Sequence, residues 1–201
     1  MKILSKKHVV IFLTLIISQL SASSFAAGHG EKWNLILEQS TVNFVSVKKS
    51  TIGEVHSFKE FSGVIDHNKA NISIDVASVD MLIPIRSERA IKYLFEAAKF
   101  SSIDVQSDVS AAMNNAKKGE TLFMDIPASL SLHGTNKDII LNVSVTKNGE
   151  NSLTVASTKP IIINAADYNM DAGITKLSNF VGDIPIIKSV PVSFVLTFKK
   201  S

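Results

Sequence analysis

Cysteine is absent from this chain of 201 residues. Without a thiol there is no disulfide framework, no cysteine-ligated zinc and no thiol nucleophile, so packing and hydrogen bonds alone must hold the fold. Histidine is scarce too, and no pair of the five has the i, i+4 spacing of a helical metal site. We therefore expect no metal site, and we expect His29, His67 and His133 to be ordinary exposed side chains.

Catalytic motifs are missing as well. The sequence has no GxSxG, Walker or dinucleotide glycine pattern, and the acidic run 167–183 lacks the arrangement of a calcium loop. We expect a protein that is not an enzyme. Carboxylates that converge in a closed apolar pocket would revive the enzymatic alternative.

Neither positive nor negative charge is in excess when residues 1–26 are left out of the count. The chain carries 21 basic and 18 acidic residues, but three lysines stand in residues 1–26, which carry no acidic group. The remaining 27–201 is balanced, which argues against nucleic acid as a partner. With 45% hydrophobic residues, this length suits one core, so we predict a single domain over 27–201.

The first 26 residues have the pattern of a secretory signal peptide. A basic start precedes the apolar run 9–17, and Ser24-Phe25-Ala26 supplies a small-x-small cleavage site. The run is shorter than the roughly 20 residues that span a bilayer, and no later segment is longer. An uncleaved anchor is the alternative, and the lack of cysteine excludes a lipoprotein. We predict export to the periplasm of a Gram-negative bacterium.

Residues 121–146 contain the clearest pattern of the chain. Apolar residues occupy every second position of 122–132 and of 139–145, on either side of the polar segment HGTNK. This period of two predicts a long antiparallel hairpin with one apolar face. Its arms are longer than the typical strand of about five or six residues, which suits a barrel wall or a large sandwich.

Further strands are predicted along most of the chain. The apolar phase slips within 41–47 and again after Val76, which suggests bulges, and Gly63 suggests a bend or a close backbone approach. Arg86–Phe100 is the one clear helix, with Ser87 as its N-cap and an apolar stripe that packs as a lid. The sum is an all-β chain of about eight strands with one main helix, and bent strands favour a barrel.

Three segments, in this order, resemble the YceI-like, or polyisoprenoid-binding, family of bacterial periplasmic proteins. They are FSGVIDHN, ASVDMLIPIRSERAIKYLFEAAKFSSIDVQSDV and IPASLSLHGTNKDIILNVSV, and the likeness runs over nearly all of Trp33–Lys199. The resemblance implies a lipocalin-like antiparallel β-barrel whose hydrophobic pore holds a long-chain isoprenoid or related amphiphile, without catalysis. The helix departs from the family pattern, because it has no histidine after Arg86.

The candidate ligand-binding residues fall into a pore set and a mouth set. Each pore residue is also a legitimate wall residue, and the alternative for the mouth is a solvated helix start that pairs with Glu88 or Asp80. The mouth is Arg86 and Arg89, whose guanidinium groups suit a phosphate. The pore set is Phe44, Phe58, Phe61, Ile72, Ile74, Val76, Leu94, Phe95, Leu130, Val143 and Phe194.

These predictions describe a periplasmic binding or carrier protein for a long-chain hydrophobic ligand, namely a polyisoprenoid, an isoprenoid quinone or a fatty-acid-like amphiphile. We expect no cofactor other than such a bound molecule. Partners would be the ligand itself, with no nucleic acid and no stable membrane insertion after signal cleavage, and a homodimer is left open. The alternative is an envelope stress protein that binds no ligand and acts through its surface.

Overall fold

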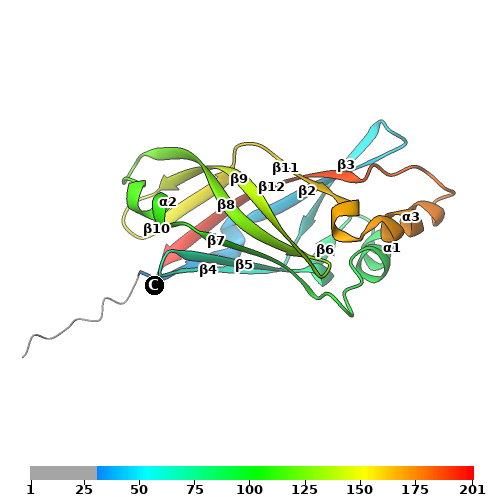
Figure 1. Cartoon of the computed structure of the whole chain (residues 1–201), viewed down its shortest axis with the longest axis horizontal. Helices are drawn as coiled ribbons and strands as arrows, with labels where there is room; N and C mark the ends of the chain where they lie inside the picture. Colours follow the sequence, from blue (N-terminus) through cyan, green and yellow to red (C-terminus); the bar gives the residue numbers. More distant parts are fainter. Residues whose placement is uncertain (1–30) are drawn as a thin grey trace, which may run out of the picture.

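The computed structural model describes residues 31–201, so the predicted signal peptide lies outside the described residues. Within them, twelve strands join antiparallel neighbours into one continuous sheet (Figure 1). The strands are β1 (Trp33–Leu35), β2 (Thr41–Lys48), β3 (Ile52–Phe58), β4 (Phe61–Asp66), β5 (Lys69–Asp75), β6 (Val79–Asp80), β7 (Ser102–Asp108), β8 (Thr121–Leu132), β9 (Thr135–Lys147), β10 (Ser152–Ser157), β11 (Ile161–Asn164) and β12 (Ser189–Lys200).

The helical elements are short and lie between these strands. None in the described residues is long and apolar enough to cross a membrane. They are the α-helices α1 (Pro84–Arg89), α2 (Ser110–Asn115) and α3 (Asp171–Asn179), the π-helix η3 (Ala90–Leu94), and the 3₁₀ turns η1 (Leu37–Gln39), η2 (Val76–Ser78) and η4 (Ala165–Tyr168).

Eight of the strands close into a barrel. Their order is β1-β4-β5-β7-β8-β9-β10-β12, and β1 closes the ring by pairing with β12, where Trp33 lies opposite Lys200. Closure pairs the strand edges that an open sheet would expose. The predicted lipocalin-like antiparallel barrel of about eight strands is confirmed.

The last strand, β12, belongs to two parts of the wall. Its second half pairs with β10 and β1, whereas its first half pairs with β11 and β2. Strands β2, β3 and β6 therefore extend the wall beyond the closed ring, toward the end of the molecule where α1 and α3 lie (Figure 1).

The predicted long hairpin is formed by β8 and β9. Their register is regular from Thr121 opposite Thr146 to Leu132 opposite Thr135. Only His133 and Gly134 form the turn, with φ of 50° and 74°. A Cβ on Gly134 would lie 2.7 Å from the Phe100 ring. This close approach and the positive φ both disfavour any residue with a side chain at this position.

His133 is not the exposed side chain that the sequence suggested. Its side chain is only 8% exposed. The ring lies 4.4 Å from that of Phe100, and its Nε2 is 3.1 Å from a carboxylate oxygen of Glu96. Through these contacts His133 ties the hairpin tip to the segment after η3.

The two predicted phase slips have different outcomes. The one within β2 marks no bulge, because β2 pairs with β3 residue by residue from Val42 opposite Phe58 to Lys48 opposite Ile52. The apparent slip arises because the inner face of β2 becomes polar at Ser46, while Val45 and Val47 lie on the outer face. The slip after Val76 is a true interruption, since η2 separates β5 from β6 there and Asp75 accepts the Ala77 N–H at 2.8 Å.

Gly63 in β4 confirms the expected close approach. A Cβ there would lie 2.5 Å from Cδ1 of Ile72, which sits directly opposite in β5, and 3.1 Å from Cδ1 of Leu35. Two large side chains share the space that a third would need.

The predicted helix is present, but it begins and ends earlier than expected. Helix α1 begins at Pro84, a favoured first position, and η3 ends at Leu94. Ser87 is therefore inside the helix, where its Oγ accepts the Met81 N–H at 3.0 Å rather than capping. The helix covers the barrel as a lid, and α3, which the sequence pattern did not indicate, packs beside it.

Candidate ligand-binding site

The interior of the barrel contains a cavity of about 200 Å³. Every residue that lines it is a valine, leucine, isoleucine, phenylalanine, alanine or methionine. They come from eight strands and from the helical elements η3, η4 and α3, together with Phe95, which directly follows η3, and Met170, which directly precedes α3. Such a surface offers no hydrogen bond and suits only an apolar molecule.

One wall of the cavity is aromatic. Phe44 and Phe58 lie on the inner faces of β2 and β3 with ring centroids 5.5 Å apart, and Phe95, directly after η3, approaches Phe58 edge-on at 5.7 Å. Tilted and edge-to-face rings at these distances attract one another beyond the area they bury. The wall is therefore continuous from the sheet to the lid.

The lid closes the cavity from the side of the helices. Leu94 and Phe95 reach it from η3 and its end, and Ile174 reaches it from α3. The two elements pack backbone to backbone at Gly173, where a Cβ would lie 2.6 Å from the carbonyl oxygen of Tyr93. Glycine is required at this point because a larger residue would push α3 off η3.

A smaller chamber of about 70 Å³ continues the interior toward α2. Ile72, Val105, Leu141, Phe194 and Leu196 line both chambers, so only side chains separate them. The barrel is thus hollow along part of its length, in two compartments with one shared wall.

Most of the predicted pore residues meet in this interior. Val143 lines the smaller chamber, whereas Phe61 and Val76 are buried in the core without lining either one. The predicted residues that line the larger chamber are Phe44, Phe58, Ile72, Ile74, Leu94, Phe95, Leu130 and Phe194.

The two predicted mouth residues lie on α1, outside the cavity. Arg86 Nη1 donates to Glu54 on β3 at 3.1 Å, so it pairs with neither Glu88 nor Asp80. The guanidinium of Arg89 lies over the Phe180 ring, 4.5 Å from its centroid.

Beyond the aromatic wall, the inner face of β2 and β3 becomes polar. His56 lies opposite Phe44, its ring centroid 5.2 Å away, and is only 2% exposed. Its Nε2 is 2.8 Å from Ser46 Oγ, and its Nδ1 has no hydrogen-bond partner among the described residues. The next pair outward holds Glu54, which accepts from Lys48 and Arg86. A partly buried polar cluster, with His56 at its inner end, therefore lies between the aromatic wall and solvent here.

This cluster predicts an acid-sensitive fold. Burial lowers the pKa of His56 below its ordinary 6.5, so the imidazole is protonated less readily in the folded chain than in the unfolded chain. Stability is then complete above pH 6.5 and falls as the pH drops below it. The hydrogen bond from Lys48 lowers the pKa of Glu54, whose own contribution is lost only below its ordinary 4.5.

Urea unfolding between pH 6.5 and 4.5 isolates the histidine contribution. We expect His56→Gln, which keeps a hydrogen-bonding side chain but does not titrate, to flatten the pH dependence in this window. His67→Gln is the matched control, because the His67 side chain is 71% exposed. Equal slopes for wild type and His56→Gln would contradict this account of the cluster.

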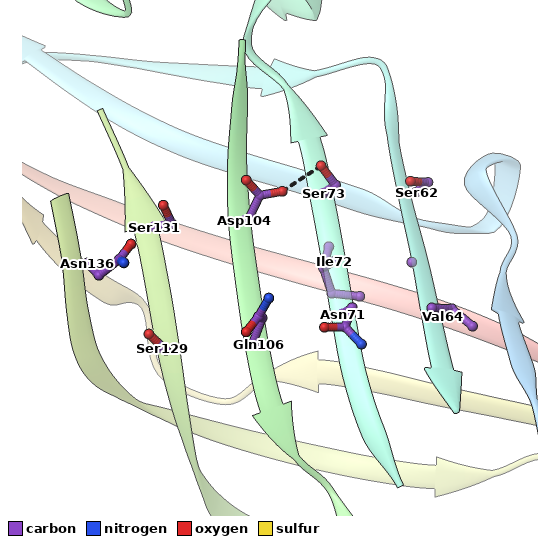
Figure 2. Close-up of a pocket in the computed structure, with 11 residues that line it drawn as sticks. Ser62, Val64, Asn71, Ile72, Ser73, Asp104, Gln106, Ser129, Ser131 and Asn136 are labelled. Atoms are coloured by element: carbon purple, nitrogen blue, oxygen red, sulfur yellow. Dashed lines mark hydrogen bonds between the residues drawn. The ribbon is translucent and has the colours of Figure 1, made fainter. Parts of the chain in front are cut away.

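A second hollow lies on the outer face of the barrel. Figure 2 shows it across β4, β5, β7, β8 and β9, with serine, asparagine and glutamine side chains toward solvent. Its one carboxylate, Asp104, accepts from Ser73 Oγ at 2.6 Å and from Ser102 Oγ at 2.7 Å. In the described chain no group of three potential metal ligands occurs. Val64 and Ile72 add apolar surface, so the lining of this outer hollow is mixed.

A closed antiparallel barrel around a cavity with an apolar lining defines the class of hollow β-barrels that enclose small hydrophobic molecules. Residues 33–198 match the family model of the YceI-like domain. The chain belongs to the YceI-like family. No curated protein matches it.

Two solved structures are similar to the chain. A polyisoprenoid binding domain from Saccharophagus degradans, implicated in plant cell wall breakdown, is 35% identical with a TM-score of 0.80, over 84% of this chain and 98% of that one. Burkholderia cenocepacia BcnA is 20% identical with a TM-score of 0.61, over 81% and 98%. The second likeness concerns the fold alone. The family and the first structure support a hydrophobic ligand-binding role and point to binding rather than catalysis.

Sequence reasoning missed the part of the site that follows β11. Ala165 lines the cavity from η4, Ile174 lines it from α3, and Met170 lines it from the residue directly before α3. The helical pattern of this segment is weak, because α3 has only nine residues and carries a glycine in its first turn. His56 was missed for another reason, since a histidine between Val55 and Ser57 in a strand carries no sign of the face it occupies.

Proposed function

We propose that this protein binds and carries a long-chain hydrophobic molecule inside its barrel. The observation that carries the proposal is the cavity inside the barrel without a single polar lining residue. Burying alkyl surface there is favoured by about 25 cal/mol for each Å² removed from water. The chemical class is a polyisoprenoid, an isoprenoid quinone or a fatty-acid-like amphiphile, which the polyisoprenoid-binding relative supports.

The size of the interior constrains how such a molecule is held. The larger chamber, at about 200 Å³, is below the roughly 300–1,000 Å³ of common ligand pockets. A long chain therefore uses both chambers and displaces the side chains between them, Phe194 among them.

The site of action that we propose is the periplasm, on the strength of the signal-like residues 1–26. Catalysis is not part of the proposal, because the apolar cavity offers no general acid, base or nucleophile.

Native mass spectrometry tests the proposal. We expect protein purified from an exported fraction to carry a hydrophobic adduct that disappears after delipidation with organic solvent and returns on incubation with a lipid extract. Identical masses before and after delipidation, together with no uptake, would contradict ligand carriage and favour the alternative of a surface-acting envelope protein.

A further inference from the structure

The end of the molecule that holds the lid also gathers exposed chain from three regions. We call it the helix end and define it as residues 47–55, 81–95 and 171–188. Backbone contacts join the β2–β3 tip to the third segment, because Lys49 N donates to the Pro185 carbonyl at 3.0 Å. Arg86 links the second segment to Glu54 in the first. Figure 1 shows α1, α3 and this hairpin tip at one end of the barrel, opposite α2.

Exposed apolar side chains concentrate on the helix end. Of the twelve large hydrophobic residues that are exposed in the described chain, eight belong to it. Leu82 is 66% exposed, Val55 is 58% exposed and Ile85 is 48% exposed. The other four are spread over β8, β9, β11 and β12 on the barrel wall. Such a gathering is typical of a surface that contacts a protein or a membrane.

The helix end is also positively charged, although the described chain as a whole is neutral. Its three segments contain seven basic and four acidic residues, whereas the rest of 31–201 contains eleven basic and fourteen acidic residues. The molecule is therefore polarised along its length. Its positive end is attracted to an anionic surface and turns toward it.

Arg89, Lys92 and Lys176 are three cations of the helix end that form no salt bridge within the described residues. They lie over aromatic rings instead: Arg89 at 4.5 Å and Lys176 at 5.4 Å from the centroid of Phe180, and Lys92 at 5.2 Å from that of Tyr93. Phe180 and Tyr93 are themselves 5.2 Å apart. Basic and aromatic groups in this combination are characteristic of the interface between water and lipid.

We propose that the helix end docks on the surface of an anionic phospholipid bilayer. Apolar side chains enter the headgroup region while lysine and arginine bind the lipid phosphates. A second copy of this chain fits less well, because a two-fold contact would bring the same positive surface against itself.

Docking there places the lid against the membrane. Leu94 and Ile174 face the cavity from the lid. The positively charged side chains on the same helical elements are Arg89, Lys92 and Lys176. A hydrophobic ligand then passes between bilayer and cavity without crossing water. Binding to the bilayer and retention of a ligand are separate properties, so either can fail without the other.

Vesicle flotation tests the docking. We expect the purified protein to float with vesicles of phosphatidylglycerol and phosphatidylethanolamine, to remain behind with pure phosphatidylcholine, and to be released by salt. Each basic residue near such a surface contributes roughly fivefold, so Arg89→Glu with Lys176→Glu should lower the partition coefficient by about 25-fold or more. Val181→Asp, in the apolar part, should lower it as well.

The matched control changes the same charge at the opposite end. Lys117→Glu with Lys118→Glu follows α2, where both side chains are exposed, and should leave the partition coefficient within about twofold of wild type. Circular dichroism checks that each variant is folded. No flotation of the wild type, or equal losses in the two double variants, would overturn the proposal.

Discussion

Replacing Val192 by tryptophan is expected to lower the affinity for a long-chain alcohol such as farnesol by about 100-fold while the barrel stays folded. Val192 lies in β12 between Phe44 of β2 and Ile161 of β11, and all three line the larger chamber. The added ring system would occupy the space that the ligand needs. Filling an existing cavity costs less than overpacking a solid core, which destabilises by about 1–3 kcal/mol.

Val195→Trp is the matched control for this prediction. It makes the same substitution in the same strand, but Val195 is 40% exposed and does not line the cavity. Calorimetric titration with farnesol should show wild-type affinity for Val195→Trp and loss for Val192→Trp. If Val192→Trp does not fold, Ala165→Leu introduces a smaller group into the same chamber. Unchanged affinity in both cavity variants would contradict the assignment of the ligand to the barrel.

Replacing Leu130 by aspartate is expected to lower the free energy of unfolding by about 4 kcal/mol or more. Leu130 is 5% exposed and lines a cavity that contains no polar group to pair with a carboxylate. Burial would raise the pKa of the new carboxyl. The penalty relative to wild type should therefore shrink as the pH falls, because the protonated form is neutral.

Phe123→Asp in the same strand separates burial from charge. Phe123 is 71% exposed on the outer face of β8, so the same acidic substitution should change the free energy of unfolding by about 1 kcal/mol or less. Urea denaturation at two pH values measures both variants. Equal destabilisation by the two substitutions would show that Leu130 is not enclosed as described.

Much of the barrel could be predicted from the sequence because it depends on local alternation. The pattern in residues 121–146 defined β8 and β9, and the same period placed Leu130 and Phe194 inside. Closure is different, since the pairing of β1 with β12 joins residues more than 160 positions apart and has no local signature. It followed from the family resemblance and from the bent strands.

The site was predictable where it follows the strands and not where it depends on tertiary packing. Gly173 reads as a helix breaker in sequence, but it is the point where α3 meets η3. Arg86 was assigned to a mouth, and its partner Glu54 lies 32 residues away on a strand. Phe44 faces the cavity, whereas Phe61 packs in a solid part of the core. Both are inward-facing residues, and the difference between them depends on the packing of the whole barrel.

A crystal structure of the protein loaded with its own extracted lipid tests the central claim most directly. The account predicts a continuous chain of electron density inside the barrel, in contact with Leu130 in the larger chamber and passing Phe194 to reach Val143 in the smaller one. Ligand density on the outer face, or an interior still closed by side chains with Leu130 and Val143 untouched, would contradict it.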